Sequence, residues 1–260
     1  MEHIASLSYG KDSIAMLEVI KEYDMPLDRI VHVEIFAYGD VSADLPPMVE
    51  FKEKADKIIK SRYGITVEHI RSKYTYEDVF YKVLSGKKSK FANNIYGFPM
   101  VKGAWCNSRL KMSVLRNFNK PDIVQYIGIA CDEPNRFHNL SERKVSPLVE
   151  HNVTEVQAFE ICYNLDLLSP IYKNSFRGGC WFCHYQGVEQ LRFLRNNYPD
   201  YWNKLLEWDL DSPVSFKADG HTVHDYEKRF TLEDEAILLP NDTTFRWNCL
   251  DDDIQLKLFI

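Results

Sequence analysis

The chain has 260 residues, of which 45% are hydrophobic, 27% charged and 13% aromatic, and its formal net charge is −6 at pH 7. This composition is typical of a globular protein and excludes a disordered, collagen-like or coiled-coil chain. The acidic balance excludes a generic polyanion binder, so any contact with nucleic acid would need a local basic patch.

Strand-like and helix-like stretches alternate through the first part of the chain. Residues 3–7 form a short apolar run that predicts a strand, and the apolar spacing that follows predicts a helix over about 14–23. Residues 30–36 are rich in β-branched side chains and predict a second strand. Apolar residues then recur at helical spacing over 48–59, after two prolines, and Gly64 predicts the end of that helix.

Two further apolar runs, at residues 65–70 and 123–129, predict two more strands. Alternation of strands and helices predicts an α/β domain with a mostly parallel sheet flanked by helices. Ligands of such sheets bind beyond the carboxyl ends of the strands. We therefore expect a site formed by residues just after Leu7, Phe36 and Ile129.

The pattern changes near the C-terminus. From about Arg192 it becomes helical and aromatic, which predicts a domain over 1–190 and a mainly helical extension over 191–260. The extension contains Tyr198, Tyr201, Trp202 and Trp208. These rings most simply form a packing face. They could also stack on nucleobases, with positive charge from Arg192, Arg195 and Lys204.

No apolar run approaches the roughly 18 residues that span a membrane, and the first residues do not resemble a signal peptide. We therefore expect a cytoplasmic protein with no membrane partner. In that reducing compartment the six cysteines are expected to be thiols, catalytic groups or metal ligands rather than disulfides.

Residues 8–13, with the sequence S-Y-G-K-D-S, connect the first predicted strand to the first predicted helix. Backbone N–H groups in such a turn, together with the positive end of the helix, form an anion site. Gly10 would let the backbone approach a phosphate, Lys11 adds a mobile positive charge, and Ser8 and Ser13 add hydroxyl donors. The upstream glycine of a Walker A loop is absent. An ordinary turn whose serines cap the helix is the alternative.

This loop resembles the S-G-G-K-D-S loop of the PP-loop ATP pyrophosphatases, with Tyr9 in place of the first glycine. Later stretches resemble, in the correct order, one branch of that superfamily, the phosphoadenosine phosphosulfate (PAPS) reductase family. They are an acidic, proline-containing helix start at 44–51, G-F-P at 97–99, W-C-N-S-R-L-K at 105–111, G-I-A-C-D-E-P-N-R at 128–136, and P-L, E-V and G-C-W-F-C between 147 and 183. The likeness covers about residues 4–186.

The resemblance implies a Rossmann-like fold of the HUP type with a five-stranded sheet, in which 1–190 is the nucleotide-binding domain. The implied ligand is ATP or a related adenine nucleotide, with Mg²⁺. The implied nucleotide contacts are Ser8, Tyr9, Gly10, Lys11, Asp12, Ser13, Asp132, Glu133 and Arg136. Lys11, Asp12, Arg109 and Lys111 are the implied catalytic groups. For Arg109 and Lys111 a solvated helix face is the alternative.

The cysteines suggest a metal centre. Cys180 and Cys183 form C-x-x-C after two glycines, a spacing at which two thiolates can share one metal. The family resemblance brings Cys106 to the same place and implies a [4Fe–4S] cluster. Its fourth ligand would be Cys131 or His184, or the iron would stay open with three cysteines. Zinc, a redox-active dithiol and buried thiols are the alternatives.

Three functions agree with these features. The first is an ATP-using enzyme that adenylates a substrate and transfers sulfur to it, with tRNA, DNA or a small molecule as acceptor and a sulfur-donor protein as partner. The second is a PAPS or adenosine phosphosulfate (APS) reductase, whose nucleophile would be Cys249 or a borrowed thiol. The third is a nucleotide-binding or partner-binding protein without activity. We expect a homo-oligomer.

Overall fold

The computed structural model describes residues 1–85, 93–99, 104–138, 140–174, 178–242 and 244–247. The chain forms two compact units. The first consists of Met1–Val79 and Trp105–Trp181, and the second of Phe80–Ala104 and Phe182–Ile260. The second unit thus begins earlier than the predicted extension and includes a segment from the middle of the chain.

The first unit contains a five-stranded sheet in the order β5-β2-β1-β6-β7, and all its neighbouring strands are parallel. The strands are β1 (Glu2–Leu7), β2 (Arg29–Glu34), β5 (Val67–Arg71), β6 (Ile123–Ile127) and β7 (Lys144–Val145). The short strands β3 (Phe36–Tyr38) and β4 (Val41–Ser42) pair separately and antiparallel. The predicted Rossmann-like α/β fold with a parallel five-stranded sheet is confirmed.

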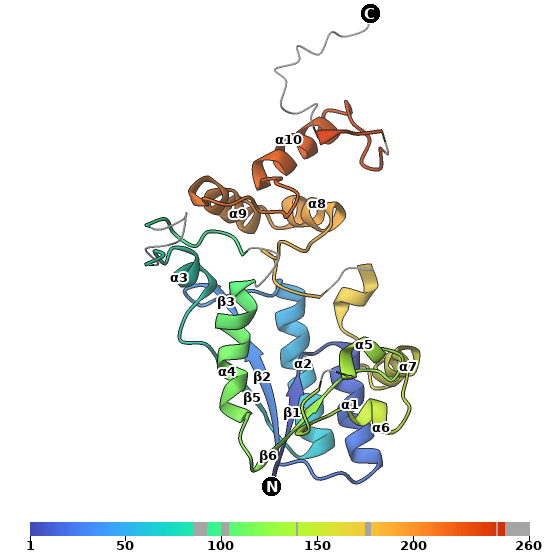
Figure 1. Cartoon of the computed structure of the whole chain (residues 1–260). Helices are drawn as coiled ribbons and strands as arrows, with labels where there is room; N and C mark the ends of the chain where they lie inside the picture. Colours follow the sequence, from blue (N-terminus) through green and yellow to red (C-terminus); the bar gives the residue numbers. More distant parts are fainter. Residues whose placement is uncertain (86–92, 100–103, 139, 175–177, 243, 248–260) are drawn as a thin grey trace, which may run out of the picture. The chain divides into compact units, whose positions relative to one another are not determined.

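Helices cover both faces of this sheet (Figure 1). The longest are α1 (Lys11–Glu22), α2 (Pro46–Tyr63) and α7 (Glu155–Asn164). Helix α2 ends where predicted, because Gly64 adopts a left-handed φ of 74° and closes the helix. The shorter elements are α3 (Tyr76–Phe80), the π-helix η1 (Asn107–Met112), α4 (Ser113–Leu115), η2 (Arg116–Phe118), α5 (Pro134–Phe137), α6 (Pro147–Glu150) and η3 (Pro170–Asn174).

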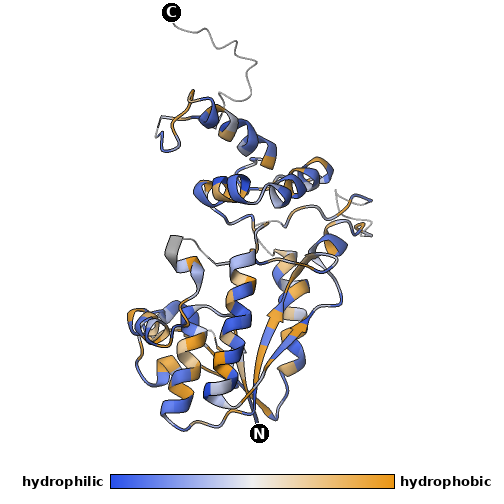
Figure 2. Ribbon diagram, turned by 180° about the vertical axis from the view of Figure 1, so that it is seen from behind, coloured by the Kyte–Doolittle hydropathy of each residue, from blue (hydrophilic) through white to orange (hydrophobic). Residues whose placement is uncertain are grey.

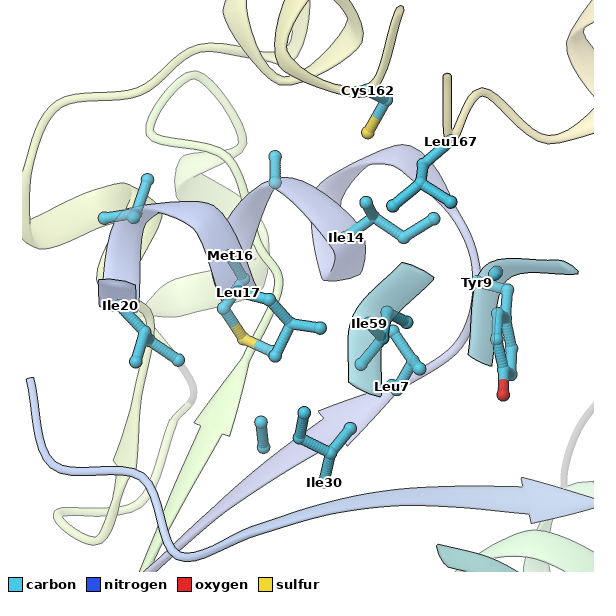
Figure 3. Packing of buried hydrophobic residues seen from close by; sticks show 14 of the residues in the cluster. Leu7, Tyr9, Ile14, Met16, Leu17, Ile20, Ile30, Ile59, Cys162 and Leu167 are labelled. Atoms are coloured by element: carbon cyan, nitrogen blue, oxygen red, sulfur yellow. The ribbon is translucent and has the colours of Figure 1, made fainter. Parts of the chain in front are cut away.

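The main core lies between the sheet and α1, α2 and α7. Strand residues Leu7 and Ile30 pack with Ile14 and Leu17 of α1 and with Ile59 of α2 (Figure 3). A smaller cluster of Ile4, Val31 and Ile123 covers the opposite face of the sheet. Hydrophobic residues accordingly concentrate on the strands and on parts of the surrounding helices (Figure 2). Burial of both faces explains why the strands are continuous apolar runs in the sequence.

The second unit is built around α8 (Val188–Asn197), α9 (Pro199–Asp211) and α10 (Val223–Asp234). Its core is aromatic: Trp202 and Trp208 are 3% and 0% exposed. Phe80 stacks on Trp208, and Phe98 packs edge-on against Phe216. These contacts explain why residues from the middle of the chain join this unit. The two tryptophans are therefore packing residues, as the simpler interpretation predicted, and are not open to stack on nucleobases.

Arginines of the second unit are engaged within it. Arg192 forms an ion pair with Glu233, and Arg195 pairs with Glu227 and Asp234. Two of the three basic residues proposed for nucleic-acid contact are thus paired with acids of α10, and the third, Lys204, pairs with Glu207 of α9. No helix in the described parts of the chain is long and apolar enough to cross a membrane.

Candidate functional site

The loop formed by residues 8–13 lies at the carboxyl ends of the parallel strands, between β1 and α1 (Figure 1). This is the edge at which such sheets bind ligands. Helix α1 begins at Lys11, and its N-cap residue, Gly10, provides no side-chain cap. The N-cap side chain therefore leaves the start of the helix uncapped, and its predicted role as an anion site stays a prediction.

The two serines of the loop build its turn. Ser8 Oγ donates a hydrogen bond to Ser13 Oγ at 3.0 Å, and Ser13 Oγ donates to the carbonyl of Gly10 at 2.9 Å. Ser13 is 4% exposed, so its hydroxyl supports the turn from within. Gly10 has an extended backbone with φ −81°, and a Cβ there would meet only ordinary contacts. Neither the backbone nor the neighbouring side chains thus require a glycine at this position.

Tyr9 anchors the loop. Its φ is 57°, in the left-handed region that costs a non-glycine residue about 1 kcal/mol. Its ring is fully buried, and its hydroxyl donates a hydrogen bond to Asp56 and lies 3.2 Å from His69 Nε2. Figure 3 shows the hydroxyl directed away from α1. Burial and the bond to Asp56 raise the pKa of Tyr9, so the phenol keeps its proton.

Gly128, at the end of β6, allows the sheet to approach this loop. A Cβ at Gly128 would lie 2.6 Å from the backbone carbonyl carbon and oxygen of Asp12 and from the backbone nitrogen of Ser13. Distances this short to backbone atoms cannot be relieved by a side-chain rotation. Gly128, the first residue of the G-I-A-C-D-E stretch, therefore allows the end of β6 to pack against the start of α1.

Lys11 places its ammonium group among carboxylates. Its Nζ lies 2.8 Å from Asp12 Oδ1 and 2.9 Å from Glu155 Oε1, with the lysine side chain 15% exposed. Burial alone would lower the pKa of Lys11, but the hydrogen bonds to Asp12 and Glu155 outweigh it and the pKa is raised. The lysine is therefore a cation held at the start of α1.

Acidic groups converge on the same place. Asp12, Glu133 and Glu155 each offer an oxygen within 4.8 Å of the others. Burial raises the pKa of Asp12 against the effect of Lys11, and the charges of Glu133 and Glu155 add to the rise. Arg136 pairs with Glu133 at 2.7 Å. Three carboxylates with two cations form an oxygen-rich set that fits Mg²⁺.

Two further contacts were not foreseen from the sequence. Asp132 accepts a hydrogen bond from the backbone N–H of Glu155 at 3.0 Å, which connects the loop after β6 to the start of α7. Tyr172, in η3, accepts a hydrogen bond from the backbone N–H of Lys11 at 3.0 Å. Its hydroxyl would lie 3.7 Å from a Cβ at Gly10. Both contacts join segments that are distant in sequence, so no local pattern could predict them. The sequence offered only the residue types, a carboxylate and a tyrosine that can accept hydrogen bonds.

Arg109 and Lys111 lie on the π-helix η1. Such helices are rare and occur frequently at functional sites. Lys111 is exposed. Burial and Lys52 lower the pKa of His32 on β2 to about 3, and the charge of Lys111 contributes to this shift. Lys111 therefore acts electrostatically on the β2 side of the edge, while its predicted catalytic role stays a prediction.

The predicted cysteine ligands are divided between the two units. Trp181 donates from its backbone N–H to Ala43 at 2.8 Å and from Nε1 to the carbonyl of Ser42 at 3.0 Å, which fixes the chain next to Cys180 beside β4. Cys183 belongs to the second unit. The metal centre of Cys106, Cys131, Cys180 and Cys183 therefore stays a prediction.

The remaining thiols and the alternative ligand have distinct surroundings. His184 is 5% exposed, and its Nε2 has no hydrogen-bond partner among the residues that the structure describes. A buried imidazole nitrogen of this kind suits a ligand, but His184 also belongs to the second unit. Cys162 is fully buried and contacts the carbonyl of Lys11, as expected of a core residue. Cys249, the nucleophile of the reductase alternative, lies outside the described residues.

The fold defines a Rossmann-like α/β protein in which the loop of residues 8–13 lies at the sheet's carboxyl edge. No protein-family model and no curated protein matches the chain. Among solved structures it is similar to the U34-tRNA thiolase NcsA from Methanococcus maripaludis, determined with its [4Fe–4S] cluster. The TM-score is 0.37 and the identity 14%, over 88% of this chain and 80% of that one. A likeness this distant says nothing about the activity of this chain.

Proposed function

We propose that the chain is an enzyme that binds ATP over residues 8–13 and acts at the α-phosphate. The observation that carries this proposal is the convergence of a lysine, an arginine and three carboxylates on the start of α1, at the carboxyl edge of a parallel sheet. The positive end of a helix dipole attracts phosphate. The lysine adds an ammonium group that can exchange its carboxylate partners for a phosphate oxygen.

In this proposal, a divalent cation must bind between the three carboxylates and the nucleotide. Asp12, Glu133 and Glu155 would repel a polyphosphate, since Lys11 and Arg136 compensate only two of the three negative charges. Mg²⁺ binds carboxylate and phosphate oxygens together and would remove this repulsion. Bound there, it would supply charge stabilisation for phosphoryl chemistry. The three carboxylates would hold it, and Lys11 would orient the phosphates.

The reaction would proceed by adenylation. A substrate oxygen attacks the α-phosphorus, the bond to the bridging oxygen breaks, and pyrophosphate leaves with that electron pair. A sulfur nucleophile then attacks the carbon that bears the adenylated oxygen, the C–O bond breaks, and AMP leaves with that oxygen and the electron pair. The chain's own contribution is to position the two reactants and to stabilise negative charge with Lys11, Arg136 and the positive end of the α1 dipole.

The cysteines support the sulfur-transfer half of the proposal. Cys106, Cys180 and Cys183, with Cys131 as a fourth ligand, would hold a [4Fe–4S] cluster, for which thiolates are the usual ligands. All four are half-buried thiols. When bound, such a cluster would supply an iron that carries sulfur. Zinc bound by the same residues would make the cysteines structural. A tRNA or DNA acceptor, a sulfur-donor protein and a homo-oligomer belong to the proposal as well.

The test compares nucleotide binding and pyrophosphate release in anaerobically purified protein. We expect Mg²⁺-dependent ATP binding that weakens about tenfold or more in Lys11→Met, because a charge-assisted contact is lost. Lys54→Met is the matched control, since Lys54 lies on α2 and pairs with the exposed Asp166. The protein should release pyrophosphate with an acceptor among tRNA, DNA and small molecules.

Two results would replace the proposal with its alternatives. Binding of PAPS or APS in preference to ATP, with reduction of either, would identify a sulfonucleotide reductase. Tight ATP binding without pyrophosphate release with any acceptor would identify a nucleotide-binding protein without activity. Iron and sulfide analysis, with Cys180→Ala for comparison, separates a cluster from zinc.

A further inference from the structure

A second group of metal-ligating side chains lies on β2 and β5, apart from the acidic set at Lys11. His32, Glu34 and His69 each offer a nitrogen or oxygen within 4.8 Å of the others. The strands explain this proximity. His32 and Glu34 are two residues apart on β2 and therefore share a face, and His32 is the register partner of His69. Glu34 Oε1 lies 3.1 Å from His69 Nδ1.

Hydrogen bonds orient both imidazoles with one nitrogen toward this group. His32 Nδ1 lies 2.9 Å from the carbonyl of Leu7, which can only accept, so Nδ1 carries the proton and Nε2 keeps its lone pair. His69 Nε2 lies 2.8 Å from a carboxylate oxygen of Asp56. On the other side of the ring, His69 Nδ1 faces Glu34, and a metal bound there would require Nδ1 without its proton. Histidines that bind metals usually donate their outer N–H to a carbonyl or a carboxylate in this way.

Negative side chains outnumber positive ones around these residues, and a divalent cation would reduce this excess of negative charge. Lys52, 6% exposed, places Nζ 2.7 Å from His32 Nε2, 2.6 Å from Asp44 and 4.0 Å from Glu34. Glu34, Asp44 and Asp56 carry three negative charges, against one positive charge on Lys52 and one on Lys111, which also acts on His32. This excess of negative charge favours a bound cation. Asp44 can retain Lys52 when a metal replaces it at His32.

We propose that His32, Glu34 and His69 bind a first-row divalent transition metal. Two imidazoles and one carboxylate form the ligand set of non-haem iron sites and of many zinc sites. Asp56 orients His69 and also accepts the hydrogen bond of Tyr9. The metal site and the nucleotide loop are therefore joined through one carboxylate. The alternative is that Lys52 is a permanent internal cation and that no metal enters.

The test is titration of the full chain with Co²⁺ alone, without nucleotide. We expect one Co²⁺ whose weak visible bands are present in the wild type and absent in His69→Gln and Glu34→Gln, with affinity about a hundredfold lower in each. His151→Gln is the matched control, since His151 stacks on Tyr23 outside the group. Thiolate ligation at the cysteines gives intense charge-transfer bands, which these variants should leave unchanged. Circular dichroism checks that each variant is folded.

Lys52→Met gives the sharper result. Removing its charge should tighten Co²⁺ binding about tenfold or more, because the ammonium lies close to the metal position. If this variant is unstable, Co²⁺ should restore its melting temperature. The proposal is overturned if the wild type and His69→Gln bind Co²⁺ identically. It is equally overturned if Lys52→Met loses stability that Co²⁺ does not restore.

Discussion

The carboxyl edge of the sheet and the helices α8–α10 both gather acidic and basic side chains, but their charges balance only in the helices. In the helical unit, Arg192, Arg195 and Arg229 face Glu227, Glu233 and Asp234, so three positive charges meet three negative ones. Glu233 is only 4% exposed and still ionised, since its hydrogen bonds to arginines lower its pKa against the effect of burial. Charges balanced in this way hold helices together.

At the sheet edge the charges do not balance. Asp12, Glu133 and Glu155 face Lys11 and Arg136, and the pKa of Asp12 is raised rather than lowered. A folded chain gains nothing from gathering like charges. The unbalanced cluster beside the loop of residues 8–13 is therefore the better candidate for function, whereas the paired charges and buried rings of the helical unit serve its packing.

Gly128→Ala should have the largest effect. The added methyl would meet the backbone of Asp12 and Ser13 at 2.6 Å, so α1 or β6 must shift. We expect a loss of about 3 kcal/mol in the free energy of unfolding, measured by urea denaturation. Gly10→Ala is the control: it should leave stability nearly unchanged and weaken ATP binding. Equal stability of the two variants would show that the strand end does not need a glycine.

Glu227→Gln tests the balanced unit. Glu227 pairs with Arg195 and also accepts a hydrogen bond from Trp202 Nε1. Loss of its charge should lower the free energy of unfolding by about 2 kcal/mol and leave nucleotide binding unchanged. Lys204→Met, which breaks a pair with Glu207 and removes the ammonium 5.8 Å from the Trp208 ring, should cost less, about 1 kcal/mol. A change in ATP affinity in Glu227→Gln would contradict the separation of roles.

Cys162 should make the first unit sensitive to alkali. Burial raises the pKa of its thiol from 9.0 to about 12. At a pH between these two pKa values, the Cys162 thiol keeps its proton in the folded protein, whereas the unfolded chain has lost it. The contribution of this thiol to stability is therefore complete below about pH 9 and decreases above it by up to about 1.4 kcal/mol per pH unit. Cys162→Ala should lack this part of the pH dependence in chemical denaturation at pH 8 to 11. An unaltered profile would exclude the thiol as its source.

Tyr172→Phe should affect stability less than Gly128→Ala or Glu227→Gln. It removes the hydroxyl that accepts the N–H of Lys11 and keeps the ring that packs edge-on against Phe159. We expect a cost of about 1 kcal/mol, typical of one hydrogen bond, in thermal denaturation. ATP binding measured alongside shows whether the hydroxyl assists the ligand or competes with it: weaker binding means assistance, and tighter binding means competition.

Much of the fold could be predicted because the signals are local. Apolar runs identified β1, β2, β5 and β6, and Gly64 marked the end of α2. The short strand β7 has only two residues, too few for a periodic signal. The bounds of the second unit were also not predictable. Phe80 and Phe98 belong there through contacts with Trp208 and Phe216, which are more than a hundred residues away in sequence.

For the site, sequence by itself determined the loop of residues 8–13 and its place after the first strand, because a turn between a strand and a helix is set by neighbouring residues. Tertiary structure alone decided which side chains meet this loop. Glu155 and Tyr172 reach Lys11 from positions more than 140 residues away, and Tyr9 is anchored by Asp56 from α2. Parallel strands cause this, since their long crossover connections bring distant segments to one edge of the sheet.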